Sequence, residues 1–119
     1  MTAKKKILVV EDSPARAAEL QYMLVSVGCK VRVARNGLEA LAFIAEKRPT
    51  IVISDIVMPE MDGYELCRQL KSVDKTKDIP VILVTSLADA RDVVHGLASG
   101  ADNFIVKPFD EKYLMSRIR

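Results

Sequence analysis

The sequence predicts an α/β fold in which five parallel strands form one sheet and helices cover both of its faces. Short apolar runs alternate with segments of helical period from end to end, a pattern typical of successive βα units. The first βα loop also lacks the glycine-rich pattern of a dinucleotide-binding fold, which favours the strand order 2-1-3-4-5. We therefore expect one doubly wound (βα)5 domain that spans residues 1–119.

The first βα unit has a short apolar run followed by a clear helix start. Residues 7–10 are the strand, and Ser13 with Pro14 supplies an N-cap and a proline at the first helical position. Gly28 closes the helix. Spacings of three and four predict a buried stripe of Ala17, Leu20, Leu24 and Val27.

The second unit begins with a strand over residues 31–34 and a helix opened by a capping box. In that box Asn36 is the N-cap and Glu39 lies three residues on, and Pro49 follows the end of the helix. The side chains expected to be buried on this helix are Leu41, Ile44 and Ala45.

The third and fourth units follow the same plan. Residues 51–54 and 81–84 are the strands, and Asp62 with Glu65 forms a second capping box before the third helix. The third helix is expected to bury Leu66, Cys67 and Leu70. The fourth helix is expected to bury Ala90, Val93, Val94 and Leu97.

The fifth unit has a strand over residues 104–106 and a short helix capped by Asp110 that buries Leu114 and Ile118. The sequence stops at Arg119 after barely two turns, a marginal length for a helix. We therefore expect that helix five is truncated and that residues 1–119 are the N-terminal module of a longer protein.

Charged and hydroxyl side chains follow the strands where the strands end. Glu11 and Asp12 follow the first strand, Asp55 the third, Thr85 the fourth and Lys107 the fifth. Carboxyl ends of parallel strands share one edge of the sheet, where open α/β folds bind ligands. In the expected strand order the first and third strands are neighbours, so the three carboxylates are expected to cluster.

This set of groups suits phosphoryl transfer with magnesium. Carboxylate and carbonyl oxygens are the ligands that Mg²⁺ prefers. Once Mg²⁺ neutralises the acidic cluster, a carboxylate oxygen can attack phosphorus and form an acyl phosphate, as in aspartyl-phosphate enzymes. We assign Asp55 as the nucleophile, Glu11 and Asp12 as metal-binding groups, Lys107 as compensating charge and Thr85 as a donor to a phosphoryl oxygen.

Four motifs that carry these groups resemble the receiver domain of two-component response regulators, the family of the chemotaxis response regulator. They are ILVVEDS at 7–13, SDIVMPEMDG at 54–63, VTS at 84–86 and GADNFIVKPF at 100–109. The resemblance covers essentially the whole chain. It implies a flavodoxin-like fold and a phosphorelay signalling switch in the cytoplasm rather than an enzyme with its own substrate.

The resemblance also implies roles for single residues. Asp55 is expected to accept phosphate from the phosphohistidine of a histidine kinase or a histidine phosphotransfer domain. Mg²⁺ is expected on Asp12, Asp55 and the main-chain carbonyl of Val57, with Glu11 acting through water.

Further implications concern signalling. Thr85 moves toward the phosphoryl group, Phe104 is the aromatic switch, and the Lys107–Pro108 peptide is cis. Apolar Val57 and Leu87 are expected to slow loss of the phosphate. The face made by helix four, strand five and helix five carries charges of both signs, which could pair across a self-dimer. Those charges are Arg91, Asp92, Asp110, Glu111, Lys112 and Arg117; they can equally be solvated.

Two other functions remain possible from the residues alone. A haloacid-dehalogenase-like phosphatase also forms an aspartyl phosphate, but its nucleophile follows the first strand, where this chain has Glu11-Asp12-Ser13. A scaffold that binds partners without phosphorylation is disfavoured by the complete set of site residues. His95, the only histidine, is expected at the surface and not as a phosphorylation site.

Composition excludes several classes of partner. The net charge of +2 is too small to indicate nucleic-acid or anionic-membrane binding. No apolar run approaches the roughly 20 residues of a membrane helix. Cys29 and Cys67 lack metal-ligand spacing and fit a reduced, cytosolic protein. The sequence identifies neither the kinase nor an output module.

Overall fold

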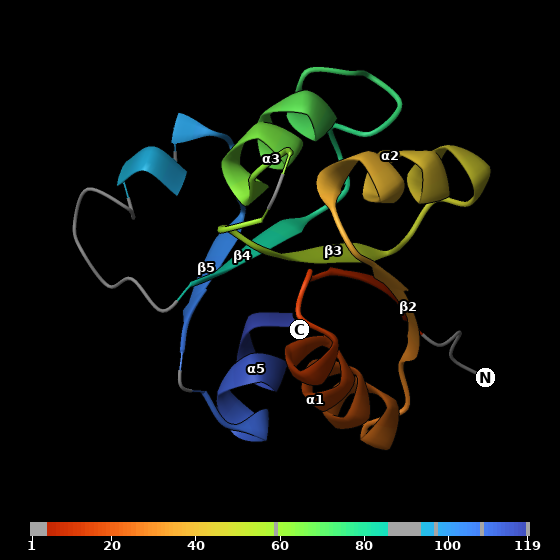
Figure 1. Ribbon diagram of the computed structural model, residues 1–119, viewed down its shortest axis with the longest axis vertical. Helices are drawn as coiled ribbons and strands as arrows, with labels where there is room; N and C mark the ends of the chain where they lie inside the picture. The colour runs from red at the N-terminus through yellow and green to blue at the C-terminus, as the bar shows by residue number, and fades with distance from the viewer. Residues whose placement is uncertain (1–4, 59, 86–93, 97, 108, 119) are drawn as a thin grey trace.

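Five parallel strands form one sheet in the order β2-β1-β3-β4-β5, as predicted (Figure 1). The computed structural model describes residues 5–58, 60–85, 94–96, 98–107 and 109–118. The strands are β1 Lys6–Val10, β2 Lys30–Ala34, β3 Ile51–Asp55, β4 Val81–Thr85 and β5 Asn103–Val106. This arrangement is the flavodoxin-like fold, and it puts β1 and β3 side by side at the point where the strand order reverses.

Helices cover both faces of the sheet. Helices α1 (Pro14–Ser26) and α5 (Glu111–Ile118) lie on one face, and α2 (Gly37–Glu46) and α3 (Gly63–Lys71) lie on the other (Figure 1). Two apolar clusters fill the space between sheet and helices, and alternate residues of the central strands point into each. Burial on both faces explains why these strands read as continuous apolar runs rather than alternating ones.

The four predicted helix caps are present. Side-chain oxygens of Ser13, Asn36, Asp62 and Asp110 accept hydrogen bonds from backbone N–H groups three residues on. The reciprocal half of the two predicted capping boxes is not formed. The Glu39 carboxylate accepts from the backbone of Arg35, outside the helix, and the Glu65 carboxylate accepts from Arg68.

Three positions predicted to be buried are exposed. Val27 is the C-cap of α1 and lies past its last turn, where it is 37% exposed. In α2 the buried stripe runs through Ala40 and Ile44, so Ala45 lies beyond it and is exposed. Val94 is 64% exposed.

Residues 94–96 and 98 are helical, in the region of the predicted fourth helix. Gly96 faces the Phe104 ring there, and a residue two positions earlier on a helix points to the opposite side, which explains the exposure of Val94. Predictions for Ala90, Val93 and Leu97 fall outside the residues that the structure describes.

The start of α3 lies directly against the end of β3. The N–H of Gly63 donates to the carbonyl of Ile56 at 2.8 Å. A Cβ atom at Gly63 would lie 2.4 Å from the Asp55 carbonyl oxygen. Only glycine therefore allows this approach, which fixes the backbone that carries Asp55.

Candidate functional site

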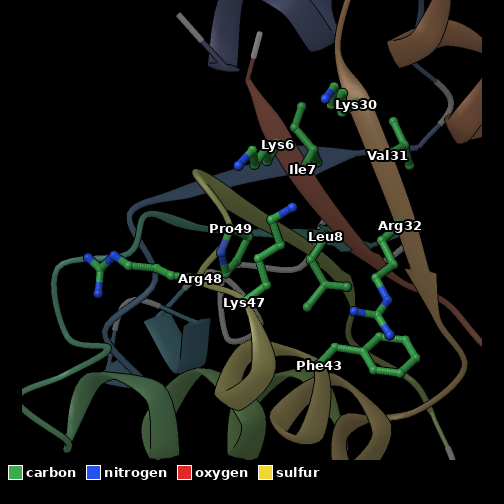
Figure 2. A pocket seen from close by; sticks show the side chains of 10 residues that line it. All are labelled: Lys6, Ile7, Leu8, Lys30, Val31, Arg32, Phe43, Lys47, Arg48 and Pro49. Carbon is green, nitrogen blue, oxygen red and sulfur yellow. The ribbon is translucent and has the colours of Figure 1, made fainter. Parts of the chain in front are cut away.

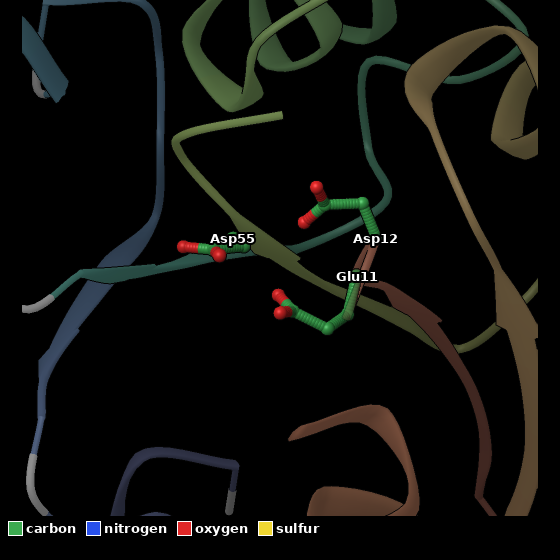
Figure 3. Close-up of side chains that lie close together, drawn as sticks. All are labelled: Glu11, Asp12 and Asp55. Carbon is green, nitrogen blue, oxygen red and sulfur yellow. The ribbon is translucent and has the colours of Figure 1, made fainter. Parts of the chain in front are cut away.

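Three carboxylates meet beyond the carboxyl ends of β1 and β3 (Figure 3). Val10, the last residue of β1, pairs with Ser54, so Glu11 and Asp12 leave β1 beside Asp55 at the end of β3. One oxygen from each of the three side chains lies within 4.8 Å of the other two. The predicted acidic cluster is therefore present.

The Asp55 carboxylate is held from two sides. Asp55 is only 8% exposed. Its Oδ1 accepts a hydrogen bond from the backbone N–H of Ile56 at 2.8 Å, and its Oδ2 lies 3.6 Å from the Lys107 Nζ. The backbone thus fixes Oδ1 of Asp55, while Oδ2 faces the ammonium group of Lys107.

Glu11 is buried next to Asp55, and its protonation reflects that position. The pKa of Glu11 is raised from its ordinary 4.5 to about 7, chiefly by burial and then by the hydrogen bond and negative charge of Asp55. Lys107 and Arg16 act in the opposite direction. Near neutral pH Glu11 is therefore partly protonated, which reduces its repulsion with Asp55.

Arg16 is the one site residue that the sequence reasoning missed. Its Nε donates to Glu11 Oε1 at 2.8 Å, and the charge of Glu11 raises the pKa of Arg16. Its position in the sequence could have indicated this role, since Arg16 lies in the first turn of a helix that begins at Pro14, two residues after Asp12. A side chain there can fold back over the end of β1.

Thr85 and Lys107 lie at the ends of β4 and β5, where they were predicted. Thr85 is 2% exposed, and its carbonyl accepts a hydrogen bond from the Lys107 N–H at 2.8 Å. Val84 pairs with Asp55 in the β3–β4 ladder, so Thr85 follows on the strand adjacent to Asp55. The hydroxyl and ammonium groups thus come from the two strands next in order after β3.

The remaining predicted residues lie around this centre. The Val57 side chain is 67% exposed, two residues after Asp55. Phe104 is half-buried on β5 and packs against the cluster below α2 and α3. Ser86, Leu87 and Pro108, and with Pro108 the predicted cis peptide, lie outside the described residues.

His95 is exposed, as predicted, and its ring stacks on Tyr64 with centroids 3.9 Å apart. Tyr64 is the second residue of α3, next to the glycine that contacts the Asp55 backbone. The stack therefore joins the helical residues 94–96 to the start of α3, a contact that no sequence pattern indicated.

The donor set fits a magnesium ion. Its three carboxylates supply only oxygen ligands, and one of them, Asp12, is exposed, which leaves room for water. Magnesium usually binds through one or two carboxylates and keeps several waters. A divalent cation would also offset the mutual repulsion of carboxylates that lie this close together.

Comparisons with known proteins agree with this site. A family model described as "Response regulator receiver domain" matches residues 7–119. The probable transcriptional regulator ycf27 of Cyanophora paradoxa is 43% identical over 116 residues, which are 98% of this chain and 47% of that protein. The chain thus spans about half the length of this relative and of the ycf27 proteins of Porphyra purpurea and Pyropia yezoensis.

Solved structures give the same result. The signal receiver domain of a histidine kinase from Syntrophus aciditrophicus has a TM-score of 0.90 and 49% identity, over 96% of this chain and 86% of that one. The receiver domain of the sensor histidine kinase PA1611 from Pseudomonas aeruginosa has a TM-score of 0.88 and 28% identity, over 96% and 93%. A magnesium ion is coordinated in the active-site cleft of the PA1611 domain.

Receiver domains are signalling domains, not classical enzymes, and their partners in two-component systems are histidine kinases. The match across residues 7–119 and the identity to ycf27 lead to one conclusion. This chain belongs to the response regulator receiver domain family of two-component signalling.

Proposed function

We propose that this domain is a magnesium-dependent phosphorylation switch whose phosphoryl acceptor is Asp55. The observation that carries the proposal is the setting of the Asp55 carboxylate. It is buried, fixed at Oδ1 by the Ile56 N–H, and faces Lys107 at Oδ2, with Glu11 and Asp12 alongside. A nucleophile held in one orientation beside a cation is arranged for attack on a phosphoryl group.

The donor in this proposal is a phosphohistidine on a histidine kinase or a histidine phosphotransfer domain. The Asp55 oxygen attacks phosphorus, the O–P bond forms, and the P–N bond to imidazole breaks. The imidazole nitrogen leaves with the bonding electron pair and takes up a proton. Lys107, 3.6 Å from Asp55 Oδ2, pairs with a phosphoryl oxygen, and the Thr85 hydroxyl donates to another.

In this proposal Asp12, Asp55 and the main-chain carbonyl of Val57 would hold magnesium, and Glu11 would act through a bound water. When bound, the ion neutralises part of the charge on the carboxylates and the phosphoryl oxygens. The 2.8 Å contact from Arg16 occupies one oxygen of Glu11, so Asp12 and Asp55 would be the better placed to bind the ion directly.

The output of the switch is a change of surface. Phosphorylation needs to supply only a few kcal/mol of differential stabilisation to invert a biased two-state equilibrium. Movement of Thr85 toward the phosphoryl group draws Phe104 inward and alters the face formed by the fourth helix, β5 and α5. On α5 this face carries exposed Glu111, Lys112 and Arg117, whose opposite charges can pair across a self-dimer.

The wider setting is also part of the proposal. In this proposal the domain belongs to a longer cytoplasmic protein, as the relatives of about twice its length suggest, and an output module there responds to the altered surface. Two free cysteines, Cys29 and Cys67, suit a reducing compartment. The apolar Val57, together with Leu87, slows loss of the phosphate, and Val57→Asn is expected to accelerate dephosphorylation.

The test is intact mass after incubation with acetyl phosphate or phosphoramidate, with and without Mg²⁺. The proteins are the wild type, Asp55→Asn and, as a matched control, Asp78→Asn, which changes an exposed carboxylate away from the site. We expect one phosphoryl addition in the wild type and the control, none in Asp55→Asn and none without Mg²⁺. A folded wild type that gains no phosphoryl group would instead favour a scaffold that works without phosphorylation.

A further inference from the structure

A second concave site lies at the opposite end of the sheet from the carboxylates. A hollow of about 250 Å³ opens where β1 and β2 begin, under the last turn of α2 (Figure 2). The proposed phosphorylation site lies beyond the carboxyl ends of the strands, so the two sites are separated by the length of the sheet. Nothing in the proposed switch chemistry uses this hollow.

The hollow has an apolar floor and a basic rim. Leu8 of β1, Phe43 of α2 and the buried Pro49 supply apolar surface. Residue pairing in the β1–β2 ladder puts a basic pair, Lys6 and Lys30, next to each other at the start of the two strands. The basic residues of the rim are Lys6, Lys30, Arg32, Lys47 and Arg48.

The two arginines of the rim already interact with other groups of the domain, whereas the three lysines pair with none of the residues that the structure describes. Arg32 lies 3.6 Å over the Phe43 ring and 3.5 Å from Glu46, and Arg48 donates to a backbone carbonyl. Lys6, Lys30 and Lys47 make no side-chain hydrogen bond or ion pair with any residue that the structure describes. Their positive charge is available to a partner.

Protection of a sheet edge accounts for only part of this pattern. Lysines on an edge strand discourage pairing with another chain, and β2 is an edge strand. That function explains Lys30 but not Lys6, which is on an inner strand, or Lys47, which follows α2. The three lysines share the hollow rather than the edge.

The size of the hollow limits what it can hold. Pockets for drug-sized ligands measure roughly 300–1,000 Å³. At about 250 Å³ this one has room for a single large side chain, with the rest of the partner outside. Carboxylates next to that side chain would lie at the level of the lysines.

We propose that this hollow docks an acidic segment of a partner protein. One aromatic or large aliphatic side chain of that segment enters over Leu8 and Phe43, and flanking Asp or Glu residues pair with Lys6, Lys30 and Lys47. The apolar anchor supplies the contact area, and the charged rim supplies orientation and selectivity.

The test uses dye-labelled peptides of about 12 residues and fluorescence anisotropy. One peptide carries a single phenylalanine among glutamates and aspartates, a second has serine for phenylalanine, and a third has lysines for the acids. The proteins are the wild type, Lys47→Glu and the control Lys112→Glu, which makes the same charge change on exposed α5. Asp55→Asn is included to separate this site from the phosphorylation site.

We expect saturable binding of the first peptide, weakened fivefold or more by Lys47→Glu and unchanged by Lys112→Glu and Asp55→Asn. NMR shifts on binding should centre on Leu8 and Phe43. Equal weakening by both lysine variants, or equal binding of the serine peptide, would overturn the proposal, because either would indicate a general charge effect. Failure to bind below about 1 mM, or binding only to vesicles of anionic lipid, would also overturn it.

Discussion

Replacement of Gly63 by alanine should damage both the stability of the domain and its phosphoryl acceptance. A Cβ atom at this position would lie 2.4 Å from the Asp55 carbonyl oxygen and 2.9 Å from the Ile56 Cα. Both atoms belong to the backbone, so no side-chain rotation relieves the overlap. The start of α3 and the end of β3 must separate by about 1 Å to reach ordinary contact.

The loss of stability in Gly63→Ala can be estimated from the contacts that the added methyl group disturbs. Overpacking of this kind costs about 1–3 kcal/mol, and loss of the Gly63 N–H bond to the Ile56 carbonyl adds about 1 kcal/mol. Alanine recovers up to about 1 kcal/mol through helix propensity and a less flexible unfolded chain. The net loss in free energy of unfolding is about 2 kcal/mol, which leaves a domain of this size folded.

Gly37→Ala is the matched control, since Gly37 is the first residue of α2 as Gly63 is of α3. Its Cβ would meet the Met61 side chain, at 2.7 Å from Sδ, and methionine is flexible enough to move. Urea denaturation should show a loss below about 1 kcal/mol for Gly37→Ala.

The rate of phosphorylation should also differ between Gly63→Ala and Gly37→Ala. A shift of about 1 Å at the nucleophile slows a positioned reaction by about 10- to 100-fold. The rate of phosphorylation by acetyl phosphate should fall by that factor in Gly63→Ala and remain near wild type in Gly37→Ala. Equal stability and equal rates in the two variants would refute the argument that backbone contact at Gly63 positions Asp55.

Three further predictions concern other parts of the domain. Because the folded pKa of Glu11 is raised from 4.5 to about 7, stability measured in EDTA should fall as pH rises through that range, by up to about 3 kcal/mol. Glu11→Gln should abolish the fall; an unchanged pH profile would contradict it. Lys71→Met removes a 2.6 Å bond to Asp102 and should cost about 1–2 kcal/mol in urea denaturation, with less than additive loss when combined with Asp102→Asn. Gly96→Ala puts a Cβ 1.9 Å from the Phe104 ring and should lower the Tm, whereas Phe104→Leu in the same chain should restore part of it.

The strands and their order could be predicted because both faces of this sheet are buried. Short apolar runs such as residues 51–53 and 81–84, each ended by polar residues, are typical of strands that are buried on both faces. Exposure on the helices was harder to predict. Ala45 and Val94 are apolar and lie near a buried stripe, but which side of a short helix faces the sheet depends on tertiary packing. A spacing of three or four residues fits more than one such stripe.

The positions of the acidic cluster could also be predicted, since parallel strands bring their carboxyl ends to one edge. What the sequence did not indicate was the set of contacts between elements. Arg16 reaches Glu11 from the adjoining helix, and Tyr64 stacks on His95 from a different one. Both contacts depend on side-chain direction after folding. The basic hollow combines residues from β1, β2 and the end of α2, and its cations are scattered in the sequence.

The two ends of the sheet carry local clusters of opposite charge that the net charge of +2 conceals. Carboxylates gather at one end, and lysines and arginines gather at the other. Under the proposed function, a bound divalent cation would offset two negative charges at the acidic end, and a phosphoryl group would add about two. The state of the site would therefore change the field that a diffusing partner meets. That field extends about 8 Å at physiological salt, so partner association rates should depend on ionic strength and differ between the two states.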